Sequence, residues 1–152
     1  MPLPSVREQI LDAVQTRLVA IVTTAGFATN AGQNVHLGEM PALGPDDPTQ
    51  GICVVVLDDE PKIQAVGFQI DIPLQIQALV SADMDEPFRD AEAILADVKR
   101  AIELPDRNLN GLLVWHGLVR GTTQTLQRKD GSQYVGIAIE YRAPMRENWG
   151  NP

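Results

Sequence analysis

Acidic side chains able to bind a metal ion or to act as acid and base occur in two short clusters. These are DDE at residues 58–60 and DMDE at residues 83–86. Carboxylate oxygens suit divalent cations, and a carboxylate pair is also the basis of many hydrolases. Neither cluster has the ligand spacing and central glycine of an EF-hand loop. We therefore predict that both serve turns and helix caps, and we keep a carboxylate-based, metal-dependent enzyme as an alternative.

Other catalytic patterns are missing from the sequence. It contains no GxxxxGK[ST], GxGxxG, HExxH or CxxC motif. His116 follows Trp115 in an apolar run, where we expect a half-buried structural residue. The single cysteine, Cys53, lies in ICVVVL, and we predict that it packs in the core, as free cysteines usually do. We therefore predict a protein that is not an enzyme, with no catalytic residue, cofactor or bound metal.

The elements that would position any site begin with an amphipathic helix. Ser5 and Glu8 have the spacing of a capping box, in which each side chain satisfies a free amide at the helix start. Apolar residues then recur at three- and four-residue steps, which predicts one buried stripe. We expect Gly26 to end the helix. The stripe consists of Val6, Ile10, Ala13, Val14, Leu18 and Ile21.

Residues 66–80 alternate between apolar and mostly polar side chains, which predicts a strand with one buried face. The apolar set runs from Val66 to Val80. At about 3.3 Å per residue the strand would reach roughly 50 Å, so we expect it to bend or to project beyond the body. Pro73 cannot donate to a ladder and predicts an edge position or a kink. A long polar-faced strand near an edge could pair with a neighbouring chain.

A second helix and a closing hairpin follow. Asp85 or Glu86 can cap a helix that has Pro87 in its first turn, and Pro105 stops it. Its apolar stripe is predicted at Phe88, Ala91, Ile94, Leu95, Val98, Ala101 and Ile102. Gly111 is predicted to begin a strand, and KDG at residues 129–131 indicates a turn to the return strand at residues 134–141.

These elements predict an α+β fold with a mostly antiparallel, four- to five-stranded sheet and two helices packed on one face. We expect one domain over residues 1–143 and an extended C-terminal tail over residues 144–152. No apolar run is long enough to span a membrane, and the first residues lack a signal-peptide pattern, so we expect the mature protein to start here, in a cytoplasm.

The net charge of −8 is unevenly distributed. Residues 37–92 carry twelve acidic and two basic side chains, whereas residues 93–152 carry six acidic and eight basic ones. Such a distribution disfavours a broad nucleic-acid-binding surface, because phosphate binding depends on Lys and Arg. It is compatible with head-to-tail attraction between copies, with an acidic surface that repels DNA, or with a solvated acidic face.

The chain resembles the tail terminator (minor tail protein U-like) family of long-tailed phages and related prophages. The resemblance spans residues 5–143 and rests on the order of the elements and on the pattern of residue types within them. Its segments are VREQILDAVQTRLVAI at the start, EMPAL at residues 39–43, the alternating strand, AEAILADVKRAIELPDRNLNGLLV at residues 91–114 and the closing IAIEYRAP. The DVKRAI helix followed by a Gly-led strand is the most suggestive of these.

This resemblance implies a structural subunit of a hexameric ring, a homo-oligomer at the head-tail junction of the virion, assembled in the host cytoplasm. The ring would cap the tail tube, stop its elongation and provide the surface for head attachment. Its partners would be the tail tube protein and a head-completion or connector protein. DNA would pass through its channel without specific binding.

Two sets of residues are our candidates for these contacts. Acidic loops facing the channel or the tube are expected at Asp46, Asp47, Asp58, Asp59 and Glu60. Inter-subunit contacts are expected at Pro73, Gln75, Gln77, Arg142, Arg146 and Trp149. The tail after residue 143 is either an arm that reaches a neighbour through Trp149 or a frayed terminus.

Other interpretations remain open from the sequence. A head-completion or connector protein and a tail-tube subunit of the same particle would also need ring closure. A carboxylate-based enzyme and a small-ligand-binding α+β domain belong to other functional classes, and the second would stay monomeric or dimeric.

Overall fold

The structure, a computed structural model, describes residues 3–41, 47–128 and 131–150. It has a six-stranded sheet in the order β1-β2-β4-β6-β5, with β3 paired to β4. β1 and β2 are parallel and all other pairs are antiparallel. The elements are α1 (Val6–Val19), η1 (Thr23–Ala25), η2 (Ala31–Gln33), β1 (Val35–Leu37), β2 (Gln50–Val56), β3 (Lys62–Gln64), β4 (Gly67–Ser81), α2 (Pro87–Glu103), β5 (Val119–Leu126) and β6 (Tyr134–Asn148).

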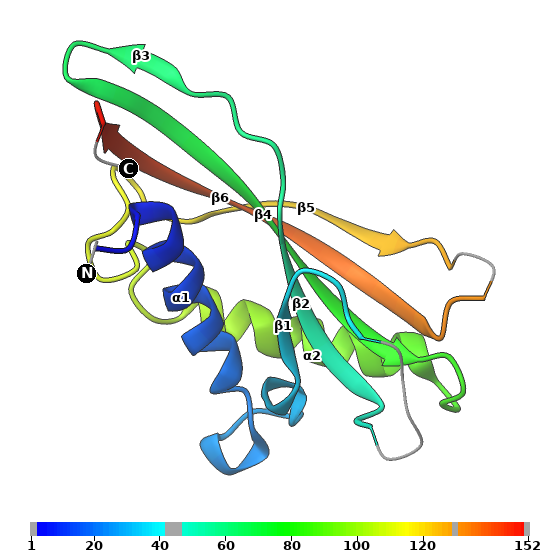
Figure 1. The fold of residues 1–152 in the computed structure, drawn as a ribbon. Coiled ribbons are helices and arrows are strands. Elements are labelled where there is room, and N and C mark those ends of the chain that lie inside the picture. Colours follow the sequence, from blue (N-terminus) through cyan, green and yellow to red (C-terminus); the bar gives the residue numbers. More distant parts are fainter. Residues whose placement is uncertain (1–2, 42–46, 129–130, 151–152) are drawn as a thin grey trace.

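The predicted α+β class is confirmed, although the sheet has six strands and includes one parallel pair where four or five mostly antiparallel strands were expected. The apolar stripes of both helices and the alternate residues of β4 and β6 belong to one buried cluster. Both helices therefore cover the same face of the sheet (Figure 1). None of the described helices is long and apolar enough to cross a membrane.

Helix α1 begins as predicted, because the Ser5 side chain accepts from the Glu8 amide while the Glu8 side chain accepts from the Ser5 amide. Ile10, Val14 and Leu18 are buried. The helix ends at Val19, so Gly26 is not its terminator. Gly26 instead ends the short helix η1 in a left-handed conformation, with φ of 89°.

Strands β4 and β6 form the long ribbon of the molecule, fifteen residues each, paired from Gly67↔Asn148 to Ser81↔Tyr134. The predicted alternation is confirmed from Ile70 onward, where alternate side chains are buried under the helices. At its other end the ribbon extends past the helices, together with β3 (Figure 1). Ala65 and Val66 form the turn between β3 and β4, so Val66 is exposed and does not belong to the buried face.

Pro73 lies in the central strand β4, so the prediction of an edge position is wrong. It is paired with Arg142 of β6 and lies just beyond Val56↔Leu74, the last pair between β2 and β4. The Pro73 carbonyl accepts from the Leu57 amide at 2.9 Å. The β2–β4 ladder stops at this point, which is why a residue without an amide proton is tolerated there.

Helix α2 has Pro87 in its first turn, as predicted, and Glu86 occupies the N-cap position without a capping side-chain bond. Most of the predicted stripe is buried. The exception is Phe88, whose side chain is exposed because it precedes the turns of α2 that lie against the sheet.

The strand predicted from Gly111 is not formed. Residues 104–118 make a loop, and β5 begins at Val119. Asp106 accepts from the amides of Asn108 and Asn110 at 2.9 and 3.0 Å, which stabilises turns in place of a strand. His116 is exposed in this loop and is not the half-buried strand residue that was expected.

The C-terminal strand is longer than predicted. β6 continues through residue 143, where the domain was expected to end, as far as Asn148. Residues 144–148 pair with residues 67–71 of β4, so this part of the expected tail belongs to the sheet. Strands β5 and β6 pair as the expected hairpin, and Lys129 and Asp130 of its turn lie outside the described residues.

Candidate assembly surfaces

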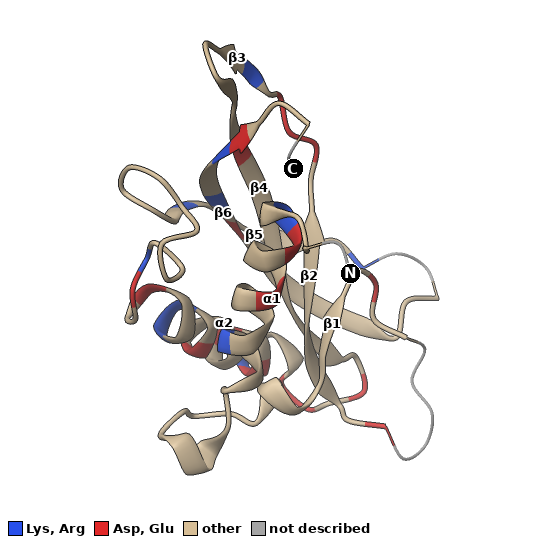
Figure 2. Cartoon of the chain, turned by 60° about the vertical axis from the view of Figure 1, so that its left-hand side comes forward, with Lys and Arg blue, Asp and Glu red and all other residues tan. Residues whose placement is uncertain are grey.

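The predicted acidic loop residues do not form one patch. Asp46 lies outside the described residues. Asp47 is exposed before the start of β2, whereas residues 58–60 follow its end. Seven residues of strand separate the two sites, a distance of about 20 Å, and the acidic stretch that leads to β3 can be followed in Figure 2. Asp59 forms an ion pair with Arg7 of α1, while Asp58 and Glu60 are exposed.

The predicted contact residues are brought together in part. Pro73, Gln75 and Gln77 occupy the face of β4 opposite the helices, and Arg142 pairs with Pro73 across the ribbon. Gln77 donates to Gln75 at 2.7 Å. Of these four residues Pro73 is buried and Arg142 is exposed, so only the polar members are accessible.

Arg146 and Trp149 lie farther along the ribbon. Arg146 pairs with Gln69 near the start of β4, and its guanidinium lies 6.0 Å from the ring of Trp115. Trp149 packs against Phe68 of its own chain, with ring centroids 4.5 Å apart, and its side chain is still 58% exposed. The indole therefore has an intramolecular partner and a free face.

Charge divides between the two edges of the sheet. Around β1, β2 and β3, the described residues 35–64 carry five acidic and one basic side chain. Around β5 and β6, the described residues 119–149 carry four basic and two acidic ones. Because β1 and β5 are the outermost strands, one edge of the sheet is acidic and the other is slightly basic.

Sequence reasoning missed an exposed apolar end of the molecule. Residues 61–69, named here the projecting hairpin, comprise β3, its turn and the start of β4. Ile63 and Val66 are each 75% exposed. Gly67 has φ of 157°, and a Cβ there would come within 2.1 Å of the Glu147 carbonyl oxygen. That glycine, next to a short run of mixed polarity, was the available signal for a tight hairpin.

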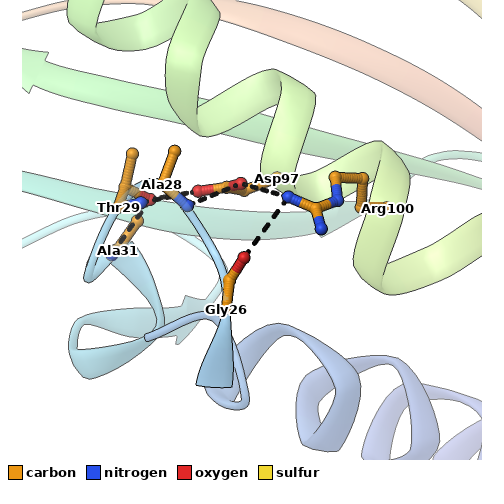
Figure 3. A network of polar contacts seen from close by, with 6 residues as sticks. All are labelled: Gly26, Ala28, Thr29, Ala31, Asp97 and Arg100. Carbon is orange, nitrogen blue, oxygen red and sulfur yellow. Dashed lines mark hydrogen bonds and ion pairs between the residues drawn. The ribbon is translucent and has the colours of Figure 1, made fainter. Parts of the chain in front are cut away.

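A buried acidic residue was also missed. Asp97 of α2 is 1% exposed and accepts from the amides of Ala28 and Thr29 and from the Thr29 hydroxyl, at 3.2, 2.8 and 2.8 Å (Figure 3). Arg100, with its Nη1 4.0 Å from Asp97, donates to the Gly26 carbonyl. Both carboxylate oxygens have partners, so Asp97 anchors residues 26–31 to α2 and is not placed to act on a substrate.

Two further titratable side chains, Cys53 and Tyr141, are buried. Cys53 is fully buried, as predicted, and burial together with the nearby Glu39 raises the pKa of its thiol to about 11. Burial and a hydrogen bond to Glu103 raise the pKa of Tyr141. Within the described ranges no three His, Cys, Asp or Glu side chains gather as a metal site.

Comparison with known proteins gives one finding on the fold. No protein-family model and no curated protein matches the chain. Among solved structures, the chain is similar to a chain of the virion of a native gene transfer agent (GTA) particle, with a TM-score of 0.51 and 21% identity. The match covers 94% of this chain and 92% of that one. The two chains therefore share their fold over nearly their whole length.

Proposed function

We propose that this chain is a structural virion subunit, and specifically a tail terminator that assembles into a hexameric ring. The ring caps the tail tube, stops its elongation and presents the head-attachment surface around the DNA channel. Its partners are further copies of itself, the tail tube protein and a head-completion or connector protein. It catalyses no reaction and needs no cofactor.

The observation that carries this proposal is the similarity to a chain of a virion particle over almost the full length of both chains. A match of that extent makes the whole domain, rather than a fragment, comparable with a virion component. The resemblance of the sequence to tail terminators supports the finer assignment.

The charge distribution supports ring formation. A ring requires two unlike surfaces on each subunit that meet head to tail and close. The acidic edge around β1, β2 and β3 and the slightly basic edge around β5 and β6 lie on opposite sides of the sheet. Opposite charges at the two sides favour this association over face-to-face pairing of like edges.

The acidic loops are suited to a channel or a tube contact. Carboxylates do not pair with phosphates, so DNA would slide past them. Because Asp47 and residues 58–60 lie at opposite ends of β2, we assign one group to the channel and the other to the tube-facing side. In the second group, Asp59 forms an ion pair with Arg7. Asp58 and Glu60 take part in none of the ion pairs between described residues.

The test is the solution mass of the purified protein, measured by light scattering over a range of concentrations, with negative-stain images of the same samples. We expect closed hexameric rings. Open-ended stacks would instead identify a tail-tube subunit, and rings that bind the head connector but not tail tubes would identify a head-completion protein. A protein that neither assembles alone nor binds added tail tubes would overturn the proposal.

The enzyme alternative has its own test. Replacing Asp58 and Asp59 together with asparagine would abolish a carboxylate-dependent hydrolytic activity. If the proposed function is correct, the wild-type protein with added Mg²⁺ or Ca²⁺ hydrolyses neither nucleic acid nor glycan, and the variant is equally inactive.

A further inference from the structure

A hollow lies at the end of the sheet opposite the projecting hairpin, on the face that the helices do not cover. It has a volume of about 390 Å³ and is lined by apolar atoms of Met40, Leu79, Leu126 and Tyr134, with Glu39 and Gln127 among its polar members. Leu79 is buried and lies over Gly136, where a Cβ would come within 2.6 Å of the leucine side chain. The apolar base of the hollow therefore depends on a glycine in β6.

The projecting hairpin has the complementary character. Ile63 and Val66 present two aliphatic side chains to solvent, and Lys62 beside them is exposed. Lys62 forms no ion pair with any described residue, and neither does Glu39 at the hollow. An apolar tip with a free cation thus faces solvent at one end of the subunit, and an apolar hollow with a free carboxylate does so at the other.

The two features cannot meet within one chain. The hairpin adjoins Gly67 and the hollow adjoins Leu79, which are twelve residues apart in the straight pairing of β4 with β6. At about 3.3 Å per residue this separation is roughly 40 Å. Any contact between them must join two copies. A contact between unlike ends of identical subunits is heterologous, and it forms a ring when the rotation between subunits closes and an open filament when it does not.

We propose that the projecting hairpin of one subunit inserts Ile63 and Val66 into the hollow of the next subunit, with Lys62 pairing with Glu39. This inference rests on the proposed ring and adds one end-to-end contact to the meeting of unlike edges, because the hairpin contains β3 whereas the hollow includes Leu126 of β5 and Tyr134 of β6. The apolar side chains supply the affinity and the charge pair sets orientation, as is usual at such interfaces. The occupant of the hollow is therefore a second copy of this chain.

Disulfide trapping tests the contact directly. In the variant Val66→Cys/Gln127→Cys, the two new thiols are too distant to join within one chain, and native Cys53 is buried. Because a disulfide needs Cα atoms within about 7 Å, mild oxidation should give a ladder of linked subunits on a non-reducing gel. The control Val66→Cys/Ala96→Cys, with the second thiol on the outer side of α2, should give none. If the wild-type protein forms rings but the two variants give the same gel pattern, the proposed contact is wrong and the proposed ring is unaffected.

Substitutions in the hairpin and a charge exchange give the second measurement. Val66→Asp should weaken self-association roughly 10- to 100-fold, since it loses one buried aliphatic side chain and buries a charge. Lys62→Glu or Glu39→Lys alone should weaken it up to about 5-fold, and the two together should restore it. Assembly unaffected by all of these overturns the contact. Failure of the wild-type protein to associate at all, in solution and on tail tubes, overturns both the contact and the ring.

Discussion

The two ends of strand β4 lie in very different surroundings. From Ile70 to Val80 its alternate side chains are buried beneath α1 and α2. From Gly67 to Gln69 it pairs with β3 and β6 beyond the helices and carries exposed apolar neighbours (Figure 1). The apolar residues of the covered region stabilise the monomer, because they are buried in its core. The exposed apolar residues of the projecting hairpin have no such role. These aliphatic residues, Ile63 and Val66, belong to the surface that we propose a second copy of this chain covers.

The largest effect should come from the covered region. Leu74→Ala removes a fully buried side chain and should lower the free energy of unfolding by about 2 to 5 kcal/mol. The matched change in the projecting hairpin, Ile63→Ala, should lower it by less than about 0.5 kcal/mol. Urea denaturation measures both. Equal effects would show that the hairpin is part of the core and would remove the contrast between the two regions.

The next effect concerns the buried carboxylate. Asp97→Ala leaves two backbone amides of residues 28 and 29 without their acceptors, and should cost about 2 to 3 kcal/mol. Glu92→Ala, on the exposed side of the same helix, is the control and should be nearly neutral. Hydrogen exchange should show faster exchange at Ala28 and Thr29 in Asp97→Ala. Unchanged protection there would contradict the anchoring role.

A smaller effect on folding is expected at Trp149. Trp149→Ala loses the ring contact with Phe68 and should cost about 0.5 to 1.5 kcal/mol. If the free face of the indole also contacts a neighbour, self-association should weaken further at concentrations where the variant is fully folded. Light scattering alongside denaturation separates the two effects. Deleting residues 144–152 is a poorer test, because it also removes part of β6.

The smallest effect appears only at alkaline pH. Burial raises the pKa of Cys53 to about 11, so the unfolded chain releases this proton at a lower pH than the folded chain does. The protonated thiol therefore contributes to the free energy of unfolding in full below the ordinary thiol pKa of about 8.5, and this contribution is lost as the pH rises towards 11. Wild-type stability should therefore fall more steeply than that of Cys53→Ala between pH 8 and 10.5. Tyr141, whose pKa is also raised, contributes equally to both proteins, and parallel slopes would contradict the prediction.

Regular elements with a strong local signal were predictable from the sequence. The capping box depends on the three-residue spacing of Ser5 and Glu8. The alternation from Ile70 and the stripe of α2 each have a period that the burial pattern repeats. Asp97 was overlooked although it lies three residues after Ile94 and four before Ala101, on the buried face. An acidic residue at stripe spacing is the signal that indicates a buried anchor.

Features that depend on distant pairing were not predictable in the same way. Pro73 was predicted at an edge because proline cannot donate to a ladder. Its place in a central strand is possible because β2 stops pairing with β4 beside it, and that end depends on the register between two separate segments. Lys62–Gln64 is too short to carry a strand pattern by itself. For the candidate surfaces, the sequence indicated opposite charge in two segments, but only the strand order places them at opposite edges.

The fifteen-rung pairing of β4 with β6 also has a mechanical consequence. Hydrogen bonds in an antiparallel pair run perpendicular to the strands, so a pull along the ribbon shears all the rungs at once instead of opening them in turn. If the hairpin is held by the next subunit, tension around the ring passes along this ribbon into the core beneath the helices. On the proposed ring, the joint would then resist load best along the ribbon axis, where a pull on the hairpin shears the whole ladder.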